Sequence, residues 1–246
     1  MEQFEGRNPV LEALQARLPI NKVLVAKGSQ GGPINRISGL CKERGITLQW
    51  VERLALDRIS QTGGKHQGVI AELAAVEYAS LDDILTSAKQ TGRDLLLVML
   101  DGVEDPHNLG SIIRTAEAAG AHGVIIPRHR AAGATAAVAR ASAGAIAHLP
   151  VVQVTNLVST CRQLKDSGAW IAGADAEAEQ MAFQAKLTGP MVLVFGGEGK
   201  GISRLLKENC DLLVRFPMQG QVNSLNVSVS AGLLLYEVVR QRELIK

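Results

Sequence analysis

Three polar segments of this 246-residue chain could carry chemistry, and each begins where an apolar run with strand character ends. They read DGVEDPHNLGSIIRTAEAAG at 101–120, GGEGKGIS at 196–203 and RFPMQGQVNSLNVSVSAGLL at 215–234. Open α/β sheets bind their ligands just beyond the carboxyl ends of their strands. Because each segment leaves such a strand end, we expect all three to contribute to a binding or catalytic site.

The first segment offers Asn108 and Arg114 on a stretch with helical spacing. A structural interpretation makes Asn108 the N-cap of that helix, since asparagine is a preferred capping residue. Arg114 follows about two turns later beside the apolar face, where an isolated arginine can extend along that face into solvent. Taken alone, this segment favours neither a structural nor a catalytic role.

The second segment contains four glycines in the six residues 196–201, and they surround Glu198 and Lys200. Such a turn between a strand and a helix predicts close approach of the backbone to a ligand. Its spacing fits neither the P-loop nor the dinucleotide fingerprint. A carboxylate beside a polyphosphate is unfavourable, so we expect a ligand with cationic or hydroxyl groups. The alternative is a tight turn with a solvated glutamate.

The third segment places Asn223-Ser224-Leu225-Asn226 at the start of the last helix, after a strand that ends at Phe216-Pro217-Met218. Ser224 could cap the helix. Asn226 could face the core without a partner, which would be energetically costly. A polar helix start in this position therefore favours a site.

A fourth candidate lies in the N-terminal part, where TGGKHQG at 62–68 forms a glycine-rich loop. The loop carries Lys65, His66 and Gln67, whose side chains can contact RNA. A plain surface turn is the alternative interpretation.

Composition narrows the class of protein. The chain is 46% hydrophobic and 20% charged, which is typical of a globular protein. We find no apolar run that approaches the roughly 18 residues of a membrane span, and no signal-peptide pattern in MEQFEGRNPVLEAL. The three cysteines have no close spacing, so we expect neither a disulfide framework nor a metal site. The net charge of +2 does not by itself indicate a nucleic-acid partner. A cytoplasmic protein is the expectation.

From residue 95 onward, short apolar runs alternate with helical patterns, which predicts a mostly parallel sheet with helices on both faces. The expected strands are 95–100, 122–127, 149–154, 169–174, 190–196 and 211–217. The expected helices are 109–119, 134–143, 156–168, 201–209 and a last one with residues 227–238 on its apolar face.

The N-terminal residues predict a separate small α/β unit. Its expected helices are 10–18, 33–44 and 52–60, and its expected strands are 22–28, 46–51 and 69–76. Ser80 and Asp83 then resemble a capping box that opens a helix to about Gln90. We therefore divide the chain into a domain at 1–76, a linker with its first helix at 77–94, and a domain at 95–246.

Together, DPHNLGSIIRTAEAAG, VFGGEGKGIS and FPMQGQVNSLNVSVSAG resemble the three signature motifs of the SpoU/TrmH family, the RNA ribose 2′-O-methyltransferases of the SPOUT superfamily. The likeness runs in order across about 95–242. The N-terminal GRNPVLEAL and GGKHQG resemble the substrate-binding domain of the 23S rRNA (guanosine-2′-O-)-methyltransferases, which is similar to L30e-like RNA binders.

The resemblance implies S-adenosyl-L-methionine as methyl donor, 23S rRNA as substrate, a homodimer, and a trefoil knot in the C-terminal domain. It assigns the polar catalytic roles to Asn108, Arg114, Glu198, Ser224 and Asn226. It assigns the donor pocket to Gly196, Gly197, Gly199, Phe216, Met218 and Leu225. Phe216 departs from the isoleucine common in the family, so the ring could reshape the adenine slot.

Three alternatives stay open. The resemblance gives Arg114 the role of proton acceptor, but arginine has a pKa above about 12 and donates rather than accepts. We therefore favour Arg114 as an electrostatic clamp on the RNA phosphate and the developing alkoxide. The substrate could be tRNA instead of rRNA, and a non-enzymatic RNA-binding protein could share the fold.

Overall fold

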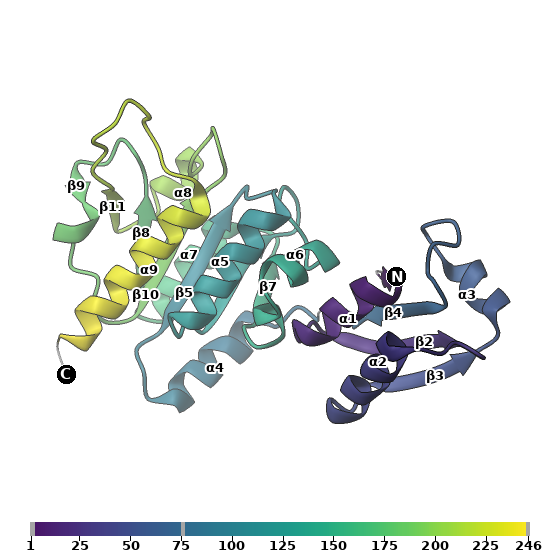
Figure 1. The fold of residues 1–246 in the computed structure, drawn as a ribbon. Helices are drawn as coiled ribbons and strands as arrows, with labels where there is room; N and C mark the ends of the chain where they lie inside the picture. The colour runs from purple at the N-terminus through teal and green to yellow at the C-terminus, as the bar shows by residue number, and fades with distance from the viewer. Residues whose placement is uncertain (1–2, 75–76, 245–246) are drawn as a thin grey trace.

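The computed structural model of the protein describes residues 3–74 and 77–244 (Figure 1). It contains one four-stranded sheet near the N-terminus and one seven-stranded sheet in the remainder of the chain. The expected domain boundary at 76/77 and the last two residues of the expected strand 69–76 touch residues 75–76, which lie outside the described residues.

The N-terminal sheet has the strand order β1-β4-β2-β3. β4 pairs antiparallel with β1 and β2, whereas β2 and β3 are parallel. The predicted helices and strands are present, with ends that differ by up to three residues, and β1 is an additional strand whose three residues are too few to show alternation. The elements are β1 (Gln3–Glu5), α1 (Arg7–Gln15), β2 (Ile20–Ala26), α2 (Gly32–Glu43), β3 (Thr47–Val51), α3 (Arg53–Ile59) and β4 (Val69–Leu73).

The larger sheet has the order β7-β6-β5-β10-β8-β11-β9, and the strand pairs within it are parallel. This confirms the predicted sheet. Chain order reverses between β5 and β10, which is the position where such sheets bind ligands. The strands are β5 (Leu96–Asp101), β6 (Gly123–Pro127), β7 (Val151–Val154), β8 (Trp170–Ala174), β9 (Gln180–Met181), β10 (Met191–Gly196) and β11 (Leu212–Arg215).

Helices cover both faces of this sheet because its strands are apolar on both sides. Along β5, Leu96 and Val98 join the cluster that contains α5 and α9, whereas Leu97 joins the cluster that contains α4 and α7. The helices are α4 (Leu81–Thr91), α5 (Pro106–Ala118), α6 (Ala136–Ala141), α7 (Leu157–Asp166), α8 (Arg204–Lys207) and α9 (Val227–Glu243), with 3-10 turns η1 (Ala145–Ala147) and η2 (Ala182–Gln184). No helix in the described part of the chain is long and apolar enough to cross a membrane.

The helix starts differ from two sequence interpretations. Asn108 is not the N-cap of α5, because Asp105 accepts the hydrogen bond from the His107 amide at 2.9 Å and Pro106 occupies the first helical position that suits proline. Ser224 is not the cap of α9, because Asn226 accepts from the Ser228 amide at 2.9 Å.

Two further helix starts, those of α4 and α8, bear on the sequence predictions. The capping of α4 is confirmed, since Ser80 Oγ accepts from the Asp83 amide at 3.1 Å. α8 is shorter than the expected 201–209, because residues 201–203 stay with the glycine-rich loop.

The two sheet units contact each other through α6 and the turn that follows it. The guanidinium of Arg140 lies 4.9 Å from the centre of the Phe4 ring. At Gly144, with φ +86°, an added Cβ would lie 3.1 Å from the carbonyl oxygens of Ala16 and Arg17. Glycine is therefore required at this close approach, and the N-terminal unit packs beside α6 (Figure 1).

Candidate active site at the carboxyl edge of the sheet

A triangle of hydrogen bonds joins the three polar segments. Asn108 Nδ2 donates to Glu198 Oε1 at 3.0 Å, and Asn226 Nδ2 donates to the same oxygen at 3.0 Å. Asn226 Nδ2 also donates to Asn108 Oδ1 at 3.0 Å. The predicted meeting of the segments is therefore confirmed, since these residues come from α5, the loop after β10 and the start of α9.

Asn226 has two functions that fix its amide. Its Oδ1 accepts from the Ser228 amide at 2.9 Å and from Ser228 Oγ at 2.6 Å, which caps α9. Its Nδ2 must then point to Glu198 and Asn108. The side chain is exposed rather than buried in the core, and it is fully paired. Asn108 is the buried member of the triangle, with 7% of its surface exposed.

A cavity of about 930 Å³ opens beside this triangle, beyond the carboxyl ends of β8, β10 and β11. Segments 174–177, 195–201, 214–218 and 223–230 supply its walls. All the residues assigned to the donor pocket line it, namely Gly196, Gly197, Gly199, Phe216, Met218 and Leu225. Of the assigned catalytic residues, Glu198, Ser224 and Asn226 line it as well.

Two of the glycines serve the loop itself rather than a ligand. An added Cβ at Gly196 would lie 1.9 Å from the carbonyl carbon of Gly201, and one at Gly197 would lie 2.0 Å from the carbonyl oxygen of Gly102. The expected close approach of backbone is present, but at these positions its partner is the protein's own backbone. Gly199 differs, because φ is +79° and the space around it is open.

Asp101 holds the same glycine-rich loop, and the sequence analysis did not identify it as a site residue. Its carbonyl accepts from the Gly197 amide at 2.8 Å, and its Oδ2 accepts from the Ser203 amide at 2.8 Å. A single residue thus holds both ends of the glycine-rich loop. Its position as the last residue of a parallel strand was the only sequence signal.

The cavity wall also contains an ion pair that the sequence did not announce, between Lys207 on α8 and Asp175 after β8. Burial raises the pKa of Asp175, but the hydrogen bond and charge of Lys207 outweigh it, so the pKa is lowered overall. Asp175 therefore stays a carboxylate. Lys207 offsets its charge, so the pair fixes this part of the wall without adding net charge to it.

Arg114 stands apart from the triangle. Its side chain is exposed, does not line the cavity, and makes no hydrogen bond or ion pair with the described residues. Six residues on from Asn108, a helix has advanced about 9 Å and turned about 240°. Within one chain, the structure does not bring Arg114 to the other catalytic candidates.

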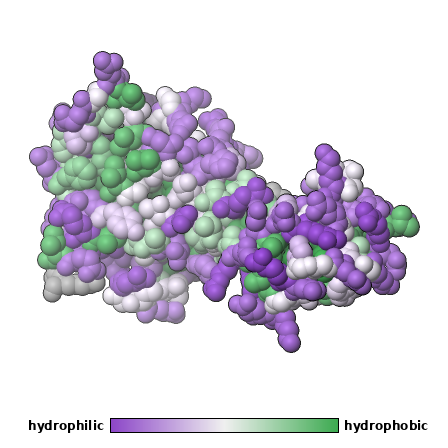
Figure 2. Space-filling view, in the orientation of Figure 1, coloured by the Kyte–Doolittle hydropathy of each residue, from purple (hydrophilic) through white to green (hydrophobic). Residues whose placement is uncertain are grey.

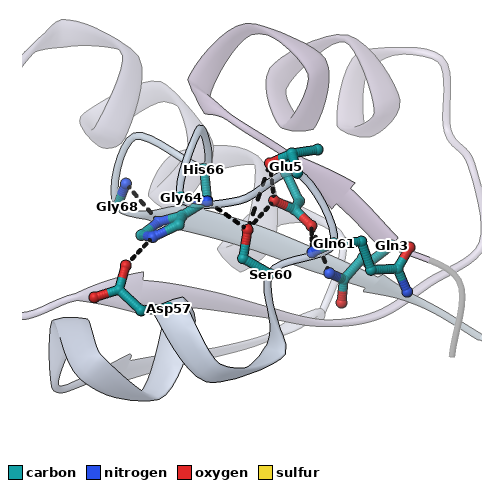
Figure 3. A network of polar contacts seen from close by, with 9 residues as sticks. Gln3, Glu5, Asp57, Ser60, Gln61, Gly64, His66 and Gly68 are labelled. Carbon is teal, nitrogen blue, oxygen red and sulfur yellow. Dashed lines mark hydrogen bonds and ion pairs between the residues drawn. The ribbon is translucent and has the colours of Figure 1, made fainter.

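The N-terminal loop is fixed by Glu5 (Figure 3). The carboxylate accepts from Ser60 Oγ at 2.6 Å, from the Gln61 amide at 2.5 Å and from Thr62 Oγ1. Burial raises the pKa of Glu5, but these hydrogen bonds outweigh it and lower the pKa from 4.5 to about 2. β1 therefore fastens the start of the loop through a carboxylate that stays charged down to about pH 2.

His66 fastens the end of the same loop and has no exposed surface (Figure 3). Its Nδ1 accepts from the Gly68 amide at 3.0 Å, and its Nε2 lies 2.8 Å from Asp57 Oδ1. A buried ring is not available to RNA, so this part of the expectation is corrected. Lys65 and Gln67 are exposed, and their contact with RNA stays a prediction.

Comparisons with known proteins agree with this geometry. Residues 95–236 match the model of the SpoU rRNA Methylase family, and residues 4–79 match that of the RNA 2′-O ribose methyltransferase substrate binding domain. The chain is 48% identical over 96% of its length to a Bacillus subtilis (strain 168) protein named as a TrmH family tRNA/rRNA methyltransferase, YacO, and covers 94% of it.

Two solved structures resemble the fold. One is the SpoU methyltransferase AviRb from Streptomyces viridochromogenes with AdoMet, at a TM-score of 0.74 and 27% identity, covering 98% of this chain and 90% of that one. The other is an AdoMet-bound rRNA methyltransferase from Sinorhizobium meliloti, at a TM-score of 0.68 and 26% identity, covering 97% of this chain and 87% of that one. The family model spans the segments that form the polar triangle and the cavity beside it. The chain belongs to the SpoU rRNA methylase family.

Proposed function

We propose that this protein transfers a methyl group from S-adenosyl-L-methionine to a ribose 2′-hydroxyl of RNA, which releases S-adenosyl-L-homocysteine and the hydroxyl proton, with a guanosine of 23S rRNA as the target. The observation that carries the proposal is the Asn108–Glu198–Asn226 triangle beside the cavity. The AdoMet bound in AviRb and in the Sinorhizobium meliloti enzyme supports the donor.

The residues of the cavity fit that donor. Bound there, it supplies an electrophilic methyl group on a sulfonium cation. Glu177 offers a carboxylate to a cationic ligand, although the acidic and basic side chains of the lining balance in number, and the partly exposed Met218 and Leu225 offer apolar surface to an adenine ring. Within the loop 196–201, the space around Gly199 and Gly201 is open, which leaves room for a ligand at these two positions.

The triangle orients the reacting groups. Glu198 Oε1 receives two amide N–H groups, so the carboxylate is held in one position at the cavity wall. Ser224 adds a hydroxyl on the same wall. These residues position the ribose, and positioning lowers the barrier of a displacement that needs aligned reactants.

Arg114 acts in this proposal as a clamp on RNA phosphate and on the developing alkoxide, because guanidinium donates two parallel hydrogen bonds and stays protonated. Because Arg114 lies away from the triangle of its own chain, the proposal includes a homodimer. In that dimer, Arg114 of one copy completes the site of the other.

The face that a second copy would cover lies on α9. Val229, Leu233 and Tyr236 recur at helical spacing and are 49%, 40% and 51% exposed. They flank the seam with α5, where an added Cβ at Gly232 would lie 3.6 Å from Thr115 Cγ2. Figure 2 shows apolar side chains gathered over α9 and the segment before it. An exposed apolar stripe of this kind is typical of an interface.

The N-terminal unit supports rRNA as the substrate. Its match to the substrate-binding model and the full-length likeness to an rRNA methyltransferase from Sinorhizobium meliloti favour that target. The Bacillus subtilis relative is named for both tRNA and rRNA, which keeps tRNA as the second candidate. We propose a cytoplasmic location together with this substrate.

Two measurements test the proposal. Mass spectrometry maps 2′-O-methyl groups in rRNA and tRNA from cells with and without the protein, and we expect one 23S rRNA guanosine to lose its methyl group. A tRNA position would select the second candidate. Calorimetry with S-adenosyl-L-methionine separates an enzyme from a non-enzymatic RNA-binding protein, because the latter gives no heat at millimolar donor.

A further inference from the structure

A second cavity of about 910 Å³ opens on the same edge of the large sheet. It lies beyond the carboxyl ends of β5, β6 and β7, whereas the first cavity lies beyond β10, β8 and β11. The sheet order therefore divides this edge between two cavities at the β5–β10 boundary. Asp101 and the segment that it holds, which ends at Ser203, form the wall between them.

Guanidinium groups from three separate segments converge on the second cavity. Arg130 follows β6, Arg162 lies on α7 and Arg204 begins α8. Arg130 has no hydrogen bond or ion pair with the described residues, and Arg162 Nε donates to the amide oxygen of Asn209 at 3.4 Å. Two of the three cations therefore lack a carboxylate partner among the described residues.

The two carboxylates in the lining are already engaged. Asp101 Oδ2 accepts from the Ser203 amide, and Glu208 accepts from Arg204 at 2.5 Å. Glu208 offsets the charge of Arg204, whereas Asp101 keeps its own negative charge because its partner is an uncharged amide. With three arginines against two carboxylates, the lining keeps an excess of one positive charge.

The first turn of α7 adds backbone donors. Asn156 Oδ1 caps the helix by accepting from the Ser159 amide at 3.0 Å. The N–H groups of Leu157 and Val158, which both line the cavity, have no carbonyl within the helix to bond. Helix N-termini and guanidinium forks both favour phosphate oxygens.

We propose that this second cavity binds a phosphodiester group of the RNA substrate next to the nucleotide that is methylated. The inference rests on the proposed function, because it requires the methylated RNA strand to run from the first cavity past Asp101 into the second. The exposed Leu205, at 56%, offers an apolar surface on which a flanking base can lie. The assigned residues are Arg130 and Arg162, with the N-terminus of α7.

The test compares Arg130→Ala/Arg162→Ala with Lys89→Ala/Lys186→Ala in the full-length chain. The control removes the same charge from exposed residues that precede β5 and β10, at the opposite edge of the sheet. Equal donor affinity and equal melting temperature establish that both variants are folded. The probe is a labelled single-stranded RNA of mixed sequence, titrated at several NaCl concentrations.

We expect the arginine variant to bind this RNA at least about tenfold more weakly at low salt than the wild-type protein. Its plot of log K against log salt should be shallower by about 0.7 for each phosphate that the variant no longer neutralises. The lysine control should keep the wild-type slope. A wild-type slope in the arginine variant overturns the inference. It does not contradict the proposed function, which methylation by the wild-type protein tests separately.

Two further outcomes are distinct. If the wild-type protein binds no RNA at any salt concentration, the proposed function fails and this inference fails with it. A free nucleotide presents the same phosphate chemistry, so AMP and inorganic phosphate are titrated separately. Saturable binding of either one that is absent in the arginine variant, with RNA binding unchanged, would assign the cavity to a free phosphate ligand and overturn the RNA assignment.

Discussion

Asn108 and Asn226 lie 118 positions apart in the chain and are joined by a hydrogen bond of 3.0 Å. The same amide of Asn226 caps α9 and donates to Glu198. Helix capping and site geometry therefore depend on one side chain. The bond to Asn108 holds the polar start of α9 against the start of α5. Because Oδ1 caps the helix and Nδ2 contacts the site, a substitution that keeps only the oxygen can separate capping from catalysis.

Asn226→Ser should separate the cap from the site. Serine caps helices about as well as asparagine, so the free energy of unfolding should stay near that of the wild-type protein. Serine cannot reach both Glu198 and Asn108, so single-turnover methyl transfer should fall steeply. Asn226→Ala should lose the cap as well, at roughly 1 kcal/mol. Urea unfolding measures the stability of both variants and single-turnover assays measure their activity. Full activity of the serine variant would contradict the role of Asn226 in the site.

Gly196→Ala and Gly199→Ala should behave differently although they lie three residues apart. At 196, the added Cβ has no space against Gly201, so the loop must move and donor binding should be lost. At 199, the space is open and the cost is a left-handed backbone, roughly 1 kcal/mol, with donor affinity largely kept. Calorimetry with S-adenosyl-L-methionine measures both. Equal affinities would show that the loop tolerates the clash.

Arg114→Ala should abolish methyl transfer with donor affinity near normal, because Arg114 does not line the donor cavity. Arg114→Lys tests the clamp against the base. A clamp needs the planar fork, so lysine should cost roughly 2–4 kcal/mol of barrier at every pH. If Arg114 is the base, lysine activity should instead rise with pH toward its pKa. A single-turnover pH–rate profile with saturating RNA distinguishes them.

Leu233→Lys/Tyr236→Lys should convert the proposed homodimer into a monomer that still binds the donor and does not methylate RNA. Sedimentation measures the first effect, because two charges in the apolar stripe on α9 disfavour association. Mixed dimers of Arg114→Ala and Asn226→Ser chains provide a second measurement. They should recover part of the activity, since one site would receive Arg114 from one copy and the triangle from the other. No recovery would place Arg114 at the site of its own chain.

Glu5→Gln should flatten the acid dependence of stability. Because the pKa of folded Glu5 lies at about 2, below its ordinary 4.5, the carboxylate stabilises the fold above pH 4.5 and this contribution is lost as the pH falls toward 2. The variant lacks this contribution, so its unfolding free energy should approach that of the wild-type protein at low pH. Glu12→Gln, on the exposed side of α1, is the matched control and should follow the wild-type curve.

The sequence by itself determined the elements and their order. Expected strands of six or seven residues between helical patterns predicted the parallel sheet, because such patterns are set by neighbours along the chain. The apolar face of α9 is confirmed in the same way, with Val227, Ala231, Leu234, Leu235 and Val238 all buried. β1 and β9 escaped prediction because two or three residues cannot establish a period.

Only the tertiary structure decided how the polar residues are used. His66 is buried because α3 brings Asp57 to its ring, and Gly197 is required because Gly102 lies against it. Both partners come from other segments of the chain. Arg114 and Asn108 share a helix, yet the packing of α5 buries one and exposes the other. Side-chain direction depends on contacts between segments far apart in sequence, and local patterns do not encode those contacts.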